Sequence, residues 1–235
     1  MSALKKFTKN TAKETELRER LFQLSVRHRR VHDHPLVIRP EAPEPLSPEI
    51  LFPGSEGRRV LELGSGWGEF CLEWLEAHPL DQYIAFEIKS ERIKNLLSRA
   101  DKLGIDRLRI IPVNFNWFLE DFLPPGLFDY MIVNFPDPWP KKRHWKHRLV
   151  QDDFPTRAAR LLRVGGQIAL ATDHGPYARK ILSVFRKSPQ FEAAYPHPHY
   201  LRVRPADLPS TRFEKTHLQA GLRPYYQRWL LGTEL

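Results

Sequence analysis

Short apolar segments alternate with amphipathic segments along residues 58–187, and this alternation limits the folds that the chain can adopt. Strands that alternate with helices form a mostly parallel sheet covered on both faces. The expected strands span residues 60–63, 83–88, 108–113, 128–133 and 167–172, with late strands at 191–195 and 225–231. The expected helices span residues 69–78, 90–103, 148–164 and 176–187. We therefore expect an α/β fold whose strand-to-helix loops share one edge of the sheet, where ligands bind.

Residues typical of helix ends support two of these boundaries. Ser90 is expected to cap the helix that it begins, and Gly104 is expected to stop it. Gly165 and Gly166 are expected to end the helix that starts at Arg148.

The N-terminal part differs in composition from the rest of the chain. Residues 1–34 are strongly basic, with an expected helix over residues 14–24. Prolines recur through residues 35–53, which is typical of an extended connector rather than a core element. We therefore divide the chain into a basic arm with a connector, residues 1–53, and a globular domain, residues 54–235. The arm either grips phosphates or is disordered.

Bulk composition excludes several classes of protein. The chain has 235 residues, a formal net charge of +9 and one cysteine, Cys71. Such a positive excess favours a phosphate-rich partner or an acidic membrane surface, although an ordinary basic enzyme can also carry it. A lone cysteine excludes an internal disulfide and suits the reducing cytoplasm. No apolar run forms a signal peptide or reaches the roughly 18–20 residues of a membrane span, and the histidines lack the companion ligands of a metal site.

A glycine-rich loop follows the first expected strand. It contains Gly64, Gly66 and Gly68, whereas a dinucleotide fingerprint would need its third glycine at position 69, which is Glu69. This spacing suits a nucleoside without a pyrophosphate. Glu62, at the strand end, would repel a pyrophosphate and attract a cationic amine or sulfonium. The loop therefore favours S-adenosylmethionine over NAD, with a plain tight turn as the structural alternative.

Two further strand ends carry polar side chains. Glu87 ends the second strand, where a carboxylate can accept hydrogen bonds from both ribose hydroxyls of a nucleotide. Asn114 and Phe115 end the third strand, where an amide could bond an adenine edge and a ring could pack on its face. A simple strand-end turn explains Asn114 equally well.

A proline-rich loop with one carboxylate follows the fourth strand. Pro136 and Pro138 restrict the backbone of Asp137, and such pre-orientation is a source of catalytic rate. The next residues, Lys141 to Arg148, interleave cations with an indole, which can neutralise phosphates and stack on a base. Together they indicate chemistry on a nucleic acid, although a buried turn and a solvated charged face remain alternatives.

These residues lead to a family resemblance. The chain resembles the tRNA (guanine-N7-)-methyltransferase family from about Val60 to its C-terminus. The most specific segments are Phe-Pro-Asp-Pro-Trp-Pro-Lys-Lys-Arg-His at 135–144, Ala-Thr-Asp-His-Gly-Pro-Tyr-Ala at 171–178 and Thr-Arg-Phe-Glu at 211–214. The resemblance implies the Rossmann-like, doubly wound, seven-stranded fold of class I methyltransferases. It also implies methyl transfer from S-adenosylmethionine to N7 of the guanosine at position 46, in the variable loop of tRNA.

The resemblance also implies roles for individual residues. The cofactor-binding set is Glu62, Gly64, Gly66, Glu87, Asn114 and Asp137, and Asp137 is also the catalytic residue. The substrate-binding set is Lys141, Asp173, Thr211, Arg212, Phe213 and Glu214. The RNA-contacting set is Arg143, His144, Trp145, Lys146, His147 and Arg148. Phe115 departs from the family, since many members carry alanine there.

The implied reaction needs no strong base, because the lone pair on guanine N7 can attack a sulfonium methyl directly. A carboxylate close to the migrating charge would stabilise the transition state, and this is the role expected of Asp137, with Asp173 as a second acceptor. The expected partner is tRNA, with no membrane, and the chain is expected to act as a cytoplasmic monomer or homodimer. Three alternatives remain: an NAD-dependent oxidoreductase, a methyltransferase for another RNA or a small molecule, and a non-catalytic RNA-binding protein.

Overall fold

A seven-stranded sheet forms the centre of the computed structural model, which describes residues 15–23, 33–54 and 57–232. The strands are β1 (Arg59–Leu63), β2 (Gln82–Phe86), β3 (Leu108–Ile111), β4 (Phe128–Asn134), β5 (Leu162–Thr172), β6 (Phe191–Ala193) and β7 (Tyr225–Leu231). Their order in the sheet is β3-β2-β1-β4-β5-β7-β6. β1 to β5 pair in parallel, and β7 runs antiparallel between β5 and β6. The expected mostly parallel α/β sheet is confirmed.

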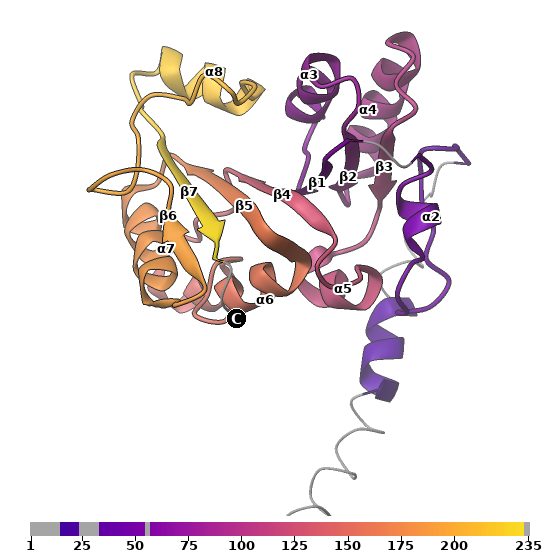
Figure 1. The fold of residues 1–235 in the computed structure, drawn as a ribbon, viewed down its shortest axis with the longest axis horizontal. Helices are drawn as coiled ribbons and strands as arrows, with labels where there is room; N and C mark the ends of the chain where they lie inside the picture. The colour runs from indigo at the N-terminus through magenta and orange to yellow at the C-terminus, as the bar shows by residue number, and fades with distance from the viewer. Residues whose placement is uncertain (1–14, 24–32, 55–56, 233–235) are drawn as a thin grey trace, which may run out of the picture.

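Helices cover both faces of this sheet (Figure 1). They are α2 (Pro48–Leu51), α3 (Glu69–Ala77), α4 (Ser90–Lys102), α5 (Phe115–Phe122), α6 (Phe154–Leu161), α7 (Gly175–Lys187) and α8 (Arg212–Gln219), with the 3-10 helix η1 (Lys142–His147). Apolar residues of α3 and α4 form one core cluster, and those of α5, α6 and α7 form the other. The strands serve both clusters because successive side chains point to opposite faces: Tyr83 joins the first and Ile84 the second.

The order of the strands fixes where a ligand can bind. β1 lies between β2 and β4, so the chain leaves β1 toward one side of the sheet and leaves β4 toward the other. In open α/β sheets, ligands bind outside the carboxyl ends of the strands at such a switch point. The loops after Leu63 and Asn134 therefore meet at the edge where a site is expected.

Two expected helix boundaries are wrong. The helix expected at 148–164 begins only at Phe154, where Pro155 occupies its first turn, and it ends at Leu161. Gly165 and Gly166 lie inside β5 rather than after a helix. A Cβ atom on Gly166 would lie 2.8 Å from the carbonyl oxygen of Arg163, so glycine here permits close backbone packing beside the irregularity in the β4–β5 register.

For α4, the expected N-cap is wrong and the expected C-terminal stop is correct. Lys89, not Ser90, is the N-cap residue, and no side chain of the cap residue bonds the first turn. Gly104 follows the helix with a φ of 64°, as expected for a glycine that stops it. Helices α5 and α8 were not expected at all.

Residues 15–23 and 33–54 contact the rest of the fold more closely than expected. The helix at residues 15–23 is confirmed, and Phe22 packs edge-on against Phe118 of α5. The backbone of Ile38 donates to the carbonyl of Ile110, which pairs this stretch with β3. The prediction of a connector outside the core is therefore wrong for Leu51 and Phe52, whose side chains are buried in the main cluster. The division at residue 53 stays a prediction. Among the described helices, none is long and apolar enough to cross a membrane.

Candidate active site

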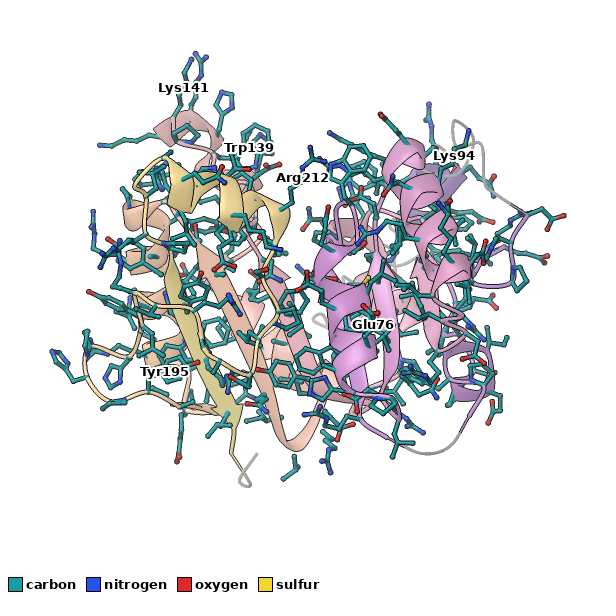
Figure 2. The ribbon with its side chains drawn as sticks, turned by 90° about the horizontal axis from the view of Figure 1, so that it is seen from above. Glu76, Lys94, Trp139, Lys141, Tyr195 and Arg212 are labelled. Carbon is teal, nitrogen blue, oxygen red and sulfur yellow. The ribbon has the colours of Figure 1, made fainter. Side chains whose placement is uncertain are left out.

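A cleft of about 470 Å³ opens at the carboxyl ends of β1 and β4, beneath α8. Its lining is Glu62, Gly64, Ser65, Gly66, Trp67, Glu69, Phe70, Arg92, Asn134, Phe135, Asp137, Thr211, Arg212, Phe213, Thr216 and His217. Figure 2 shows Arg212 extending from α8 toward the half of the molecule that carries α3 and α4, with Trp139 and Lys141 at the same end. The volume falls within the roughly 300–1,000 Å³ of small-molecule sites. The predicted glycine loop and Asp137 are thus brought together.

The three glycines of the loop after β1 have different structural roles. All three have positive φ: 88° at Gly64, 60° at Gly66 and 82° at Gly68. A Cβ atom at Gly68 would lie 2.3 Å from Leu96, so this glycine lets α3 pack against α4. A Cβ atom at Gly66 would meet no atom within 4 Å. The open space above Gly66 lets a ligand approach the backbone closely.

Glu62 is a buried carboxylate on the floor of the cleft. The hydroxyl of Tyr83 donates to its Oε2 at 3.0 Å, and Nδ2 of Asn134 lies 3.5 Å from its Oε1. Burial raises the pKa of Glu62 to about 7, although the hydrogen bond from Tyr83 opposes this rise. Glu62 therefore changes charge near neutral pH, and a cation in the cleft would favour its ionised form.

Glu87 holds together the glycine loop and the start of α4. Its Oε1 accepts hydrogen bonds from the amides of Ile88 and Lys89, at 2.7 and 2.9 Å. Its Oε2 accepts from the amide of Gly66 at 3.0 Å and from Arg92 at 3.3 Å. This carboxylate therefore ties the two residues before α4 to the glycine loop, and it lies next to the cleft lining rather than in it.

Asn114 lies at the start of α5 and caps it, because its side-chain oxygen accepts from the amide of Asn116. It is outside the cleft lining. Its neighbour Phe115 packs edge-on against Phe86, and its ring would be 3.9 Å from a Cβ atom at Gly64. Phe115 therefore borders the glycine loop, and Asn114 has a structural role in α5.

The loop that carries Asp137 is held in an unusual backbone conformation. Phe135 and Trp139 have φ values of 49° and 40°, which non-glycine residues rarely adopt. Each such residue costs about 1–3 kcal/mol, which the surrounding contacts must offset. The Asp137 side chain lines the cleft and is exposed, and no donor from the described residues bonds its carboxylate. The loop thus presents a free carboxylate to whatever enters the cleft.

Helix α8 closes the cleft on the opposite side. Thr211 caps the helix, and its hydroxyl accepts from the amide of Glu214, which completes a capping box. Glu214 is only 2% exposed and accepts from the Tyr226 hydroxyl at 2.7 Å. Glu214 therefore anchors α8 to β7 and does not face the cleft, so the expectation that it contacts substrate is not supported.

The aromatic rings of α8 form one wall of the cleft. Phe213 stacks on His217 with ring centroids 3.9 Å apart, and Phe135 lies 4.9 Å from Phe213. Nδ1 of His217 is 3.1 Å from Oδ2 of Asp173, which brings Asp173 next to this wall. Sequence reasoning missed His217 and Thr216. The Thr-x-x-Glu pattern at 211–214 predicts a helix start, and residue 217 then shares a face with residue 213.

The basic segment lies beyond the Asp137 loop. Lys141 is exposed and caps η1, whose residues are mostly exposed cations and aromatic rings. Arg148 is the exception, because it is only 6% exposed. Its guanidinium donates to the carbonyl of Pro138 rather than facing solvent. The expected RNA contact of Arg148 is therefore not supported by its position.

Among the described residues, no group of three or more histidine, cysteine, aspartate or glutamate side chains could hold a metal ion. The polar side chains of the cleft include three carboxylates, two guanidinium groups, an amide, an imidazole and three hydroxyls: Glu62, Glu69, Asp137, Arg92, Arg212, Asn134, His217, Ser65, Thr211 and Thr216. The carboxylates suit an organic cation, and the other polar groups can bond the hydroxyl and anionic groups of the same ligand.

Comparison with known proteins agrees with this geometry. Residues 56–226 match the model of a family described as "Putative methyltransferase". A tRNA (guanine-N(7)-)-methyltransferase of Leptospira interrogans is 40% identical over 181 residues, which span 77% of this chain and 82% of that protein. A protein of the same name from Nitrosomonas europaea is 35% identical over 206 residues, with 87% and 90% covered.

Solved structures share the fold at lower identity. TrmN from Thermus thermophilus superposes with a TM-score of 0.54 at 20% identity, over 75% of this chain and 44% of that one. A geranyl diphosphate C-methyltransferase from Streptomyces coelicolor superposes with a TM-score of 0.51 at 13% identity, over 76% and 71%. The seven-stranded methyltransferase fold implied by the sequence is confirmed. The chain belongs to the tRNA (guanine-N(7)-)-methyltransferase family.

Proposed function

We propose that this protein transfers a methyl group from S-adenosylmethionine to N7 of a guanosine in tRNA, the one at position 46 in the variable loop. The observation that carries this proposal is the free Asp137 carboxylate, which lines the same cleft as Glu62 and the glycine loop. The names of the relatives from Leptospira and Nitrosomonas support methyl transfer to guanine N7 in tRNA.

The residues present fit the cofactor. A buried carboxylate with a raised pKa, Glu62, suits the cationic end of the molecule. The open space above Gly66 suits a nucleoside that lies on the backbone. The Streptomyces structure, which shares the fold, is a complex with S-adenosyl-L-homocysteine. When bound, S-adenosylmethionine supplies an electrophilic methyl group on a sulfonium.

Glu87 is the proposed acceptor for the ribose hydroxyls. A carboxylate has about four acceptor positions, and Glu87 uses them for three amides and Arg92. The contact with Arg92 is the longest of the four, at 3.3 Å, and Arg92 also lines the cleft. We propose that Arg92 gives way when a hydroxyl binds to Glu87. Asn114 contributes indirectly, because it fixes the start of α5 behind Phe115.

Asp137 and Asp173 act on the guanine. N7 has a lone pair and needs no deprotonation, so the task of the protein is alignment and charge stabilisation. As guanine gains positive charge, the fixed Asp137 carboxylate stabilises it. Asp173, whose Oδ2 lies near His217, is the proposed acceptor for guanine N–H groups. The ring wall of Phe213 and His217 offers a face on which the base can stack.

The exposed cations at Lys141 and in η1 are the proposed tRNA contact. They continue directly from the Asp137 loop, so a phosphate chain bound there would bring a base to the cleft. The proposed RNA-contacting residues are Arg143, His144, Trp145, Lys146 and His147. The proposed substrate-binding residues include Lys141, Thr211, Arg212 and Phe213. The oligomeric state, monomer or homodimer, and the cytoplasmic location also stay predictions.

A single assay tests the function. The protein is incubated with radiolabelled S-adenosylmethionine and unmodified tRNA, and the nucleosides are then analysed. We expect N7-methylguanosine from the variable loop. Label on another nucleoside, or on no nucleoside, would refute the proposal and favour another methyltransferase or a non-catalytic RNA-binding protein respectively.

The role of Asp137 has its own test. Asp137→Ala is expected to lower kcat by about 10²–10³-fold, the usual effect of losing one transition-state stabiliser. Its affinity for tRNA should stay close to that of the wild type, because the exposed cations are unchanged. Asp153→Asn, which neutralises an exposed carboxylate without a capping bond, is the matched control. Wild-type turnover by Asp137→Ala would remove Asp137 from the chemistry.

A further inference from the structure

Arg148 is a buried cation without an acidic partner among the described residues. Its side chain lies directly after η1 and is 6% exposed. A buried charge is costly unless its donors are satisfied. Here the partners are backbone carbonyls and aromatic rings rather than carboxylates. The donors of Arg148 are therefore directed to the protein backbone.

The contacts of Arg148 converge on the Asp137 loop. Its Nε donates to the carbonyl of Pro138 at 2.7 Å, and its Nη2 donates to the carbonyl of Trp139 at 3.4 Å. Pro138 is the residue after Asp137, and Trp139 is one of the two residues of this loop with positive φ. Arg148 thus bonds both residues that follow Asp137, at the point where the backbone is strained.

Two ring faces hold the guanidinium in place. Its carbon lies 4.5 Å from the centre of the Trp145 ring and 4.9 Å from that of Tyr177. Tyr177 is fully buried in α7, and its hydroxyl accepts from the amide of Val150. The guanidinium is therefore fixed from the core side by α7 and from the outer side by η1. This links the loop to the rigid part of the fold.

We propose that Arg148 is a positioning residue that holds the Asp137 loop in its strained conformation, and that it makes no contact with tRNA. This inference rests on the proposed function, because it concerns the orientation of the proposed catalytic carboxylate. A basic residue in a basic segment would otherwise be taken as a phosphate ligand. The two roles differ in what they affect: alignment determines kcat, whereas a phosphate contact determines KM and its salt dependence.

The experiment compares Arg148→Met and Arg148→Lys with Lys146→Met. Arg148→Met keeps the volume without donors, Arg148→Lys keeps one charged donor group, and Lys146 is an exposed neighbour in η1. We expect Arg148→Met to lower kcat about 100-fold, as for a 1 Å misplacement, with KM for tRNA and the salt slope unchanged. Arg148→Lys should recover roughly tenfold of this loss, since one carbonyl contact is restored. Lys146→Met should raise KM and reduce the salt slope at unchanged kcat.

A second readout does not depend on activity. Trypsin can cut after Lys141, Lys142 and Arg143, which lie just beyond the loop. If Arg148 holds the loop, cleavage there should be faster by about tenfold in Arg148→Met, which corresponds to local opening. Lys146→Met should be cut at the wild-type rate. This measurement separates the failure of the inference from the failure of the proposed function, because it needs neither cofactor nor tRNA.

The outcomes are distinct. Slow turnover at normal KM, together with faster cleavage, supports the positioning role. A raised KM with a reduced salt slope and wild-type kcat would make Arg148 a phosphate ligand and overturn it. If Arg148→Met does not fold, judged by thermal melting, Arg148→Lys decides: a folded Lys variant with full kcat and normal cleavage also overturns the proposal. Wild-type protein that methylates no tRNA would refute the proposed function while leaving the cleavage result valid.

Discussion

Burial of the Glu62 carboxylate costs folding free energy, and it also makes the cleft favour a cationic ligand. It is a carboxylate with 1% exposure whose hydrogen bonds come from Tyr83 and, more weakly, Asn134. Burial raises the pKa of Glu62 to about 7. In the protein without ligand, the protonated form is therefore stable up to neutral pH. A bound cation changes this balance, because an adjacent positive charge favours the carboxylate.

The first prediction follows from this pKa. Binding of S-adenosylmethionine should strengthen as pH rises from about 5.5 to 7.5 and then level off, because Glu62 must be ionised to attract the cation. Below pH 7, affinity should fall by up to about tenfold per pH unit. Isothermal titration calorimetry at several pH values measures this trend. Glu62→Gln should bind more weakly at pH 8 and lose most of the dependence, whereas Glu76→Gln, on the exposed face of α3 (Figure 2), should behave as the wild type.

Glu62 also makes the stability of the ligand-free protein depend on pH, in the direction opposite to that of cofactor affinity. The pKa of Glu62 is higher in the folded protein than the usual value near 4.5, so ionisation costs folding free energy. The stability contributed by its protonated form is complete below about pH 4.5 and is lost as pH rises to about 7. Thermal melts should show wild-type protein losing stability relative to Glu62→Gln over this interval. A constant difference between the two proteins would contradict the raised pKa.

Sequence could identify the site residues that are defined by backbone position, but not those defined by side-chain direction. Glu62 lies near the end of β1 and Asp137 follows β4, and both strands have a recognisable pattern, so their place at the sheet edge was predictable. Arg148 and Glu214 belong to motifs that also contain exposed polar residues, and only tertiary packing turns them inward. His217 reaches the cleft because of a helix that the sequence reading did not include.

Helix α8 is the element on which the guanine side of the cleft depends. It supplies Arg212, Phe213, Thr216 and His217 to the lining, yet its one buried residue is Glu214. Helices held by few apolar contacts open locally more often than the core does. The capping box of Thr211 and Glu214, with the bond from Tyr226, is therefore a large part of what keeps α8 in place.

The second prediction concerns this cap. Thr211→Ala should remove about 1 kcal/mol from the local stability of α8, the usual worth of an N-cap. Amide hydrogen exchange in residues 212–219 should become roughly five times faster, and methyl transfer should lose a similar factor in kcat/KM. Thr211→Ser retains the capping hydroxyl and is the control. Exchange rates that are equal in all three proteins would show that α8 does not depend on its cap.

Helices α5 and α8 were not predicted from the sequence, and the physical reason is the same for both. Helices α5 and α8 are eight residues each, too short for a clear apolar periodicity. Their start signals, Asn114 and the Thr211–Glu214 pair, lay inside segments already interpreted as ligand contacts. Helix α6 was expected to start six residues too early, although Gln151, Asp152 and Asp153 separate Val150 from it and Pro155 marks its first turn. Apart from α6 and the start of β5, which lies at Leu162 rather than Gln167, the expected strands and helices of the domain were predicted to within two residues.

In the whole molecule, the candidate active site and the exposed cations of η1 occupy adjacent but distinct regions. The sequence patterns alone predicted a mostly parallel sheet, because they fix neither the neighbours of β1 nor the antiparallel β7. The seven-stranded, doubly wound arrangement was expected only from the family resemblance. The observed order brings the loops after β1 and β4 together, and the cations of η1 continue outward from that edge. A net charge of +9 thus has a local component beside the cleft as well as a diffuse one.

The last prediction separates these two components. The triple variant Lys141→Glu, Arg143→Glu, Lys146→Glu should bind tRNA more weakly and with a smaller salt dependence. Each phosphate contact that is lost should reduce the slope of log affinity against log salt by about 0.7–0.9. The control, Lys94→Glu, Arg160→Glu, Arg186→Glu, reverses three exposed cations on α4, α6 and α7. It lowers the net charge by the same amount but lies away from η1, and Figure 2 shows Lys94 in the half opposite Lys141. If the positive charge acts only as a diffuse field, both triples will weaken binding equally. If η1 is the contact, only the first triple will change the slope, since counterions are released from the phosphates that the protein touches.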